Sequence, residues 1–176
     1  ATTLSLPPDA PYPNRCGNCT RCIKHCPTGA LSPEGYVDSR LCISYLTIEH
    51  KGAIPLELRE KFGDHLFGCD DCVGACPWNR MHIATTEPRF APRPLPDPAA
   101  ILGWSEADFD AATAGSAVRR AGFEGLRRNA CVVLGNTGTK ADLPALKDAA
   151  ESGTDLVAEH ARWAVGKIEA REGNTV

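Results

Sequence analysis

The sequence lacks features that define several large classes of protein. No stretch is apolar for long enough to cross a membrane, and no secretion signal opens it. Basic residues are not in excess, because 19 Lys and Arg stand against 22 Asp and Glu, for a formal net charge of -3. A membrane protein and a wholly basic nucleic-acid-binding protein are thus excluded, and contact with nucleic acid would need a local basic patch. We expect a cytoplasmic monomer.

Aromatic residues are scarce, at 6%, whereas cysteine is abundant, with nine in the chain. An odd number of cysteines without a secretion signal argues against a framework of disulfides. Several of the cysteines are also spaced too tightly for relaxed disulfide geometry. The pattern therefore predicts reduced thiols that bind metal.

The first run of cysteines has the spacing of bacterial ferredoxins that carry two [4Fe-4S] clusters. It reads Cys16-x2-Cys19-x2-Cys22-x3-Cys26, followed by Pro27. In this pattern three cysteines wrap one cluster, and the fourth, before the proline, binds the other cluster. A zinc site is the alternative, but zinc favours ligands in separated pairs.

The second run, Cys69-x2-Cys72-x3-Cys76, lacks one cysteine, because Leu66 stands where the ferredoxin pattern requires it. Cys42 is the spare thiol upstream, and we expect it to replace the missing ligand. The alternative leaves Cys42 free beside a cluster, where it would be prone to oxidation. The prediction is that cluster one is bound by Cys16, Cys19, Cys22 and Cys76, and cluster two by Cys26, Cys42, Cys69 and Cys72.

The chain changes character from Trp104, where prolines become rare and apolar residues take helical spacing. "LRRNACVVLG" from Leu126 and "VAEHARWAVG" from Val157 carry matching apolar positions, with a possible linking helix between them. A repeat of this length with paired helices indicates a short HEAT-like unit, although a plain helical bundle is an alternative. Cys131, the ninth cysteine, lies in this apolar region and is predicted to be a packed core thiol.

These observations predict an α+β fold that is mostly α-helical. Residues 16–86 are expected to form a ferredoxin-like domain with two [4Fe-4S] clusters. Residues 87–103 carry several prolines and are expected to be a linker without regular structure. Residues 104–172 are expected to form the HEAT-like helical domain, and residues 1–15 read as a proline-rich linker.

The motifs together resemble the epoxyqueuosine reductase family. The resemblance rests on "CGNCTRCIKHCPTGAL", "CISYLTIEHKGAIP", "GCDDCVGACPWNR" and "GLRRNACVVLGNTG", which span nearly the whole chain. It implies a cobalamin-binding domain, then the two-cluster domain, then HEAT-like helices, and removal of the epoxide oxygen from epoxyqueuosine at the wobble position of tRNA. The layout is also similar to that of reductive dehalogenases.

The chain departs from this family in one respect, since it contains no cobalamin domain. Residues 1–15 look like the segment that follows such a domain. The proton-donating acid of the family belongs to the cobalamin domain. We therefore name no catalytic residue here and expect the chain alone to be inactive. The partners implied by the resemblance are tRNA carrying epoxyqueuosine, cobalamin and an external electron donor.

The resemblance also implies which residues lie near cobalamin. These are Ser44, just after Cys42, and the acids Asp70 and Asp71 between the second-run cysteines. The alternative for the two acids is a solvated turn or the cap of a short helix.

A local excess of arginine near residue 120 favours contact with tRNA phosphates. Gly122 and Gly125 interrupt this region, so we expect the arginines to lie on two adjoining elements that form one basic patch. The alternative is a solvated face or internal salt bridges. The predicted tRNA-binding residues are Lys51, Arg119, Arg120, Arg127 and Arg128.

Two other functions are compatible with the cysteine pattern. One is a stand-alone ferredoxin-like electron carrier, which has no need of the helical repeats. The other is part of a corrinoid reductase that acts on a small molecule, which the "CISYLTIEHKG" segment disfavours.

Overall fold

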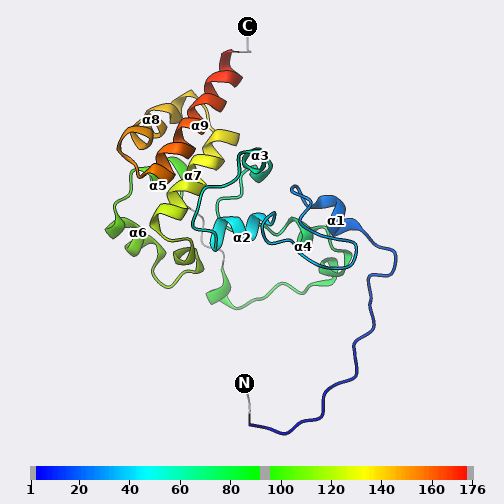
Figure 1. Cartoon of the computed structure of the whole chain (residues 1–176). Coiled ribbons are helices and arrows are strands. Elements are labelled where there is room, and N and C mark those ends of the chain that lie inside the picture. Colours follow the sequence, from blue (N-terminus) through cyan, green and yellow to red (C-terminus); the bar gives the residue numbers. More distant parts are fainter. Residues whose placement is uncertain (1–2, 92–95, 174–176) are drawn as a thin grey trace.

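The computed structural model describes residues 3–91 and 96–173, and this part of the chain is mostly helical (Figure 1). The β component of the predicted α+β fold is reduced, within these residues, to one isolated antiparallel bridge between Leu31 and Val37. Both predicted linkers include residues outside the described part, namely 1, 2 and 92–95. The helices are α1 (Arg21–His25), α2 (Ile43–Ile48), α3 (Leu56–Arg59), α4 (Asp71–Gly74), α5 (Pro98–Leu102), α6 (Glu106–Thr113), α7 (Phe123–Thr137), α8 (Leu143–Ser152) and α9 (Asp155–Gly173).

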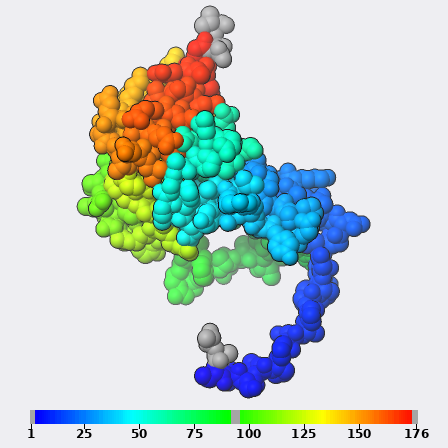
Figure 2. Space-filling view, in the orientation of Figure 1, coloured from blue at the N-terminus to red at the C-terminus, as the bar shows by residue number. Residues whose placement is uncertain are grey.

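Short 3-10 helices connect several of these elements: η1 (Glu60–Phe62), η2 (Pro77–Met81), η3 (Pro88–Phe90), η4 (Ala117–Ala121) and η5 (Lys140–Asp142). Residues 3–20 are exposed, and the part of this segment before Cys16 runs away from the rest of the molecule as an extended arm (Figure 2). No helix among the described residues is both long enough and apolar enough to span a membrane.

The helical region is built on α7, which packs against α5 and α9, while α8 packs against α9 (Figure 1). Leu126, Ala130 and Leu134 form the predicted apolar stripe of α7, and all three are buried. Val157 and Ala161 of α9 are fully buried as well. The two predicted stripes and the linking helix are thus confirmed, whereas the repeat relation between them stays a prediction.

The helical region begins earlier than the sequence indicated. Helix α5 lies inside the predicted linker 87–103, where the Asp97 carboxylate accepts a hydrogen bond from the Ala99 N–H at 3.1 Å. Pro98 occupies the first turn, where a helix tolerates proline because the N–H it lacks would have no partner. Ile101 and Leu102 are buried in the helical core. The expectation of irregular structure is therefore wrong for the end of this segment.

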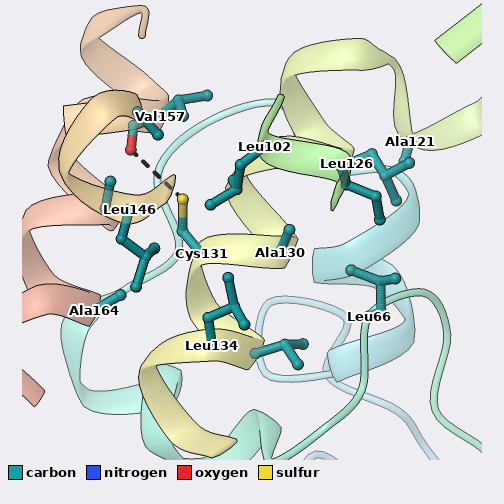
Figure 3. Close-up of a cluster of buried hydrophobic side chains, with 14 of the residues drawn as sticks. Leu66, Leu102, Ala121, Leu126, Ala130, Cys131, Leu134, Leu146, Val157 and Ala164 are labelled. Carbon is teal, nitrogen blue, oxygen red and sulfur yellow. Dashed lines mark hydrogen bonds between the residues drawn. The ribbon is translucent and has the colours of Figure 1, made fainter. Parts of the chain in front are cut away.

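The segment between Cys42 and Cys69 shares its core with the helical region. Ile43, Ile54 and Phe62 pack with Val132 of α7. Leu66 joins the main core of the helical region, as Figure 3 shows. The two predicted domains are therefore joined by continuous packing and not by the linker alone.

Cys131 is a core thiol, as predicted. It has no exposed surface, and its Sγ lies 3.9 Å from the carbonyl oxygen of Val157 (Figure 3). Burial raises the pKa of the Cys131 thiol to about 12, so it stays protonated and apolar in character at neutral pH.

His160 of α9 links the helical region to the segment before α3. Its Nε2 accepts a hydrogen bond from the Ile54 N–H at 3.1 Å, and its Nδ1 donates to the Leu156 carbonyl at 2.7 Å. This pair of contacts requires the neutral ring with the proton on Nδ1. Burial of the ring lowers the pKa of His160 to about 4.

This pKa predicts a loss of stability in mild acid. Above pH 6.5 the ring is neutral in both the folded and the unfolded chain. As the pH falls from 6.5 to about 4, the unfolded chain binds a proton that the folded chain does not. The free energy of unfolding should then fall by up to about 1.4 kcal/mol per pH unit from this group. In His160→Gln the free energy of unfolding should therefore fall less between pH 7 and pH 5 than in the parent. Urea unfolding at the two pH values measures this difference, and an equal fall in variant and parent would contradict it.

Two glycines that match in the predicted repeat lie in opposite environments. A Cβ on Gly135 would lie 2.2 Å from the Trp163 ring, whereas a Cβ on Gly166 would meet nothing within 4 Å. Gly135→Ala should therefore destabilise the chain by roughly 1–3 kcal/mol through overpacking. Gly166→Ala should stabilise it by roughly 0.5–1 kcal/mol through helix propensity. Chemical denaturation checks both, and a stabilising Gly135→Ala would contradict the close packing of α7 on α9.

Candidate metal centre and adjoining cavity

Four cysteines from distant parts of the sequence line one small cavity of about 230 Å³. They are Cys26, Cys42, Cys69 and Cys72, the four thiols predicted for cluster two. Cys26 follows α1, Cys42 precedes α2, and the other two flank the start of α4. The fold thus brings Cys42 to the second run, although it lies far from that run in the sequence.

The electrostatics of these thiols favour a bound cation over four free thiolates. Burial raises the pKa of Cys69 and Cys72, and the charges of neighbouring thiolates, Cys42 among them, raise it further. At Cys26 burial also disfavours the thiolate, but hydrogen bonds from the Thr28 hydroxyl and backbone N–H groups outweigh it and lower the pKa. Four mutually repelling thiolates are stable together only around positive charge. The donor set fits an iron–sulfur cluster.

The cysteines predicted for cluster one include two at the surface of the molecule, on the side of the cysteine region that faces away from α7. Cys16 and Cys19 are exposed in a turn closed by a hydrogen bond from the Cys19 N–H to the Cys16 carbonyl at 3.0 Å. Cys22 lies on α1, and Cys76 follows α4, which packs against α1. Trp78 lines a shallow hollow with Cys16, beside this group.

A second, wider cavity of about 1010 Å³ adjoins the first. Ser44, Asp70 and Asp71, the three residues predicted to face cobalamin, all line it. Together with Cys69 they also line the four-cysteine cavity, so the two cavities share a wall. Neither acid uses its side chain to cap α4, so the capping alternative does not apply.

Sequence reasoning missed several polar residues of the wide cavity. His65 Nε2 lies 3.2 Å from Asp71 Oδ2 and 3.7 Å from Cys69 Sγ. The ligand atoms of these three residues are within 4.8 Å of one another, which could hold a metal ion. Because Cys69 also belongs to the four-cysteine cavity, a separate ion would compete for that thiol. No motif marks His65 in the sequence, nor the other missed residues: Arg21, His25 and Arg80.

The predicted phosphate-binding arginines do lie on two adjoining elements. Arg119 and Arg120 are exposed on η4, and Gly122, with φ 76°, separates η4 from α7. Arg119 pairs with Asp110, and Arg120 pairs with Glu49. The Nζ of Lys51 donates to the carbonyl oxygens of Arg120 and Ala121, at 2.8 and 3.1 Å. Lys51 thus joins the segment after α2 to η4.

The prediction for Arg128 is wrong. Its side chain has no exposed surface and donates hydrogen bonds to backbone carbonyls, so it cannot reach a phosphate. Arg127 is only 12% exposed in its side chain, donates to the Leu102 carbonyl at 3.1 Å and lies over the Phe123 ring. Charge alone did not distinguish the buried Arg128 and the half-buried Arg127 from arginines at the surface.

Comparison with known proteins supports an iron–sulfur domain in this region. A family model described as a 4Fe-4S double cluster binding domain matches residues 15–79, which contain all eight predicted ligands. The chain is 47% identical to the epoxyqueuosine reductase of Francisella cf. novicida, over 93% of this chain and 47% of that protein. It is 44% identical to that of Escherichia coli, over 96% of this chain and 45% of that protein.

Solved structures give the same result. An epoxyqueuosine reductase from Bacillus subtilis superposes with a TM-score of 0.82 at 33% identity, over 93% of this chain and 45% of that one. A crystal structure of an epoxyqueuosine reductase with an epoxyqueuosine-modified tRNA-Tyr stem loop gives 0.83 at 33% identity, over 93% and 44%.

Residues 15–79 are therefore similar to iron–sulfur domains of the double-cluster class. The resemblance to the epoxyqueuosine reductases is confirmed, and the chain spans about half the length of the curated relatives it matches.

The ligand assignment predicts a selective effect of Cys42→Ala. Anaerobic reconstitution of the parent chain should yield about eight iron atoms, four for each cubane cluster. The variant should lose about half of them, because one of the four cysteines around the small cavity is gone, and should keep one of the two EPR signals of the reduced chain. Cys131→Ala is the control and should load as the parent does. If both signals survive in Cys42→Ala, the thiol is not a ligand.

Proposed function

We propose that this chain is the electron-transfer and tRNA-binding portion of an epoxyqueuosine reductase. The single observation that carries the proposal is the shared wall between the two cavities. A cluster held by Cys26, Cys42, Cys69 and Cys72 would lie directly beside the wide cavity, where Ser44, Asp70 and Asp71 converge. The small cavity would thus hold the electron carrier and the wide one its acceptor.

The positions of the cysteines also support an order of electron transfer. Cys16 and Cys19 are exposed, so an external donor would reach cluster one. Cluster two would follow, because Cys26 of the first run and Cys76 of the second are exchanged between the two ligand sets and keep the clusters close. Cys69 of cluster two lines the wide cavity, so electrons would leave there.

The volume and the polar lining of the wide cavity support the proposal that cobalamin would bind there. Its volume of about 1010 Å³ is at the upper limit for drug-sized ligands, as a macrocycle requires. Ser44, Asp70 and Asp71 would hold the group by accepting hydrogen bonds from amides at its edge. Bound there, cobalamin would supply a cobalt centre that passes low-potential electrons to the substrate.

The proposed reaction converts the epoxide of epoxyqueuosine to the alkene of queuosine. It consumes two electrons and two protons, and the oxygen leaves as water. Each cluster carries one electron at a time, so two clusters match the number of electrons needed. The proton donor would lie in the half of the protein that this chain does not span, and the chain alone would be inactive.

A chimera tests this proposal in cells. The other half of the Francisella cf. novicida enzyme, joined to this chain, should restore queuosine in the tRNA of a bacterium that lacks its own reductase. Nucleoside mass spectrometry measures the product, and Cys42→Ala in the chimera is the inactive control. Accumulation of epoxyqueuosine despite full iron loading of the chimera would contradict the proposal.

We propose that tRNA contacts η4 through Arg119 and Arg120, which are exposed and lie beside the hydrogen bonds that Lys51 donates to this element. Because arginines that bind phosphates release counterions, Arg119→Gln with Arg120→Gln should weaken tRNA binding. The slope of log affinity against log salt should become shallower by about 0.7–0.9 for each phosphate that the variant no longer neutralises. Filter binding with a queuosine-family tRNA at several salt concentrations measures both effects.

The matched control is Lys140→Gln with Lys147→Gln, on η5 and α8. These lysines are also exposed and pair with acids, as the two arginines do. The lysine variant should bind tRNA as the parent does. Equal affinity and slope for the arginine variant and the parent would mean that Arg119 and Arg120 only form surface ion pairs and do not contact tRNA.

A further inference from the structure

Two fully buried polar residues of α7, Arg128 and Asn129, reach into the segment that carries Cys42 and Cys69. The Nδ2 of Asn129 donates to the Thr47 carbonyl at 2.8 Å and to the Leu66 carbonyl at 3.0 Å. Its Oδ1 accepts from the Arg128 guanidinium at 2.8 Å. Every polar atom of the Asn129 amide is thus used, and its orientation is fixed.

Thr47 carries this contact toward both cysteines. Its hydroxyl donates to the Ile43 carbonyl at 2.8 Å, on the residue after Cys42. The same oxygen accepts a hydrogen bond from the Gly68 N–H at 2.9 Å, on the residue before Cys69. One buried side chain therefore ties together the two backbone positions next to these two ligands.

Arg128 holds the other end of α2. Its guanidinium donates to the carbonyls of Leu46, His50 and Gly52 at 2.7–2.8 Å. The last carbonyls of a helix have no partner within the helix, so this contact fixes where α2 ends. The position of α2, and of Cys42 at its start, is thereby set from α7.

We propose that Arg128, Asn129 and Thr47 are positioning residues that set the distance between Cys42 and Cys69, and so the assembly and potential of cluster two. The inference rests on the proposed function, in which these two thiols bind one cluster. In a complete ferredoxin run, local spacing would place the ligands. Here Leu66 replaces the missing cysteine, and its carbonyl is one of the two that Asn129 holds.

Isosteric variants of these residues test the inference. Thr47→Val removes the acceptor of the Gly68 N–H, and Asn129→Leu removes both donors to the ligand segments. After anaerobic reconstitution, each should lose at least half of the cluster-two EPR signal or shift its midpoint potential, while the cluster-one signal is kept. Thr47→Ser retains the hydroxyl and should restore the parent signal.

Two control variants separate positioning from general stability. Thr113 is buried and donates to the Phe109 carbonyl at 2.7 Å, so Thr113→Val repeats the chemistry of Thr47→Val away from the cysteines. Asn136, on the same helix as Asn129, donates to the carbonyls of Arg59 and Gly63 at 2.8 and 3.1 Å. Asn136→Leu and Thr113→Val should lower the melting temperature without changing either EPR signal.

The outcomes distinguish this inference from the proposed function. If the parent chain loads only one cluster or binds zinc, the proposed function fails. If the parent loads two clusters and Thr47→Val and Asn129→Leu match it in signal and potential, the inference fails. An equal decrease of the cluster-two signal in the Asn136→Leu control would overturn it as well. If Asn129→Leu does not fold, the comparison of the cluster-two signal and potential between Thr47→Val and Thr47→Ser decides whether the inference holds.

Discussion

The hydrogen bonds of the buried Arg128 guanidinium to backbone carbonyls are the interaction on which the rest of the structure depends. This arginine lies on the central helix α7 and donates to three carbonyls, that of Leu46 in the last turn of α2 and those of His50 and Gly52 after this helix. Burial lowers its pKa, but only to about 10, so it stays charged at neutral pH. A buried cation without partners is very costly, so the segment of residues 46–52 must keep its place against α7. Apolar packing of Ile43 and Phe62 on Val132 completes the joint.

This joint explains why the helical region and the cysteine region form one unit. Figure 1 shows α2 and α3 beside α7, with α1 and α4 further out. The candidate metal centre therefore has one inner side, next to α2 and α7, and one outer side, where Cys16 and Cys19 are exposed. The proposed electron transfer would use this asymmetry, because the outer side would meet a donor while the inner side would hold its distance to the acceptor.

Much of the site was accessible from the sequence, because cysteine spacing in a ferredoxin run reflects the geometry of the cluster. The four thiols predicted for cluster two, Cys42 included, do line one cavity. The prediction that Arg128 binds phosphate was wrong because its partners are backbone carbonyls, which no pattern of side chains in the sequence reveals. Helix α5 was not predicted because the prolines of this segment indicated irregular structure. Pro98, however, lies in the first turn of α5, where a helix tolerates proline. His65 was missed because only the fold brings it to Cys69 and Asp71.

The most direct measurement is a crystal structure of the anaerobically reconstituted chain with anomalous diffraction at the iron edge. Two groups of iron atoms should appear, one of them within the cavity lined by Cys26, Cys42, Cys69 and Cys72 and bonded to all four sulfurs. The hydrogen bonds of Thr47 and Asn129 to the two ligand segments should be unchanged. A single iron group, or a second cluster completed by His65 with Cys42 unbound, would contradict this account.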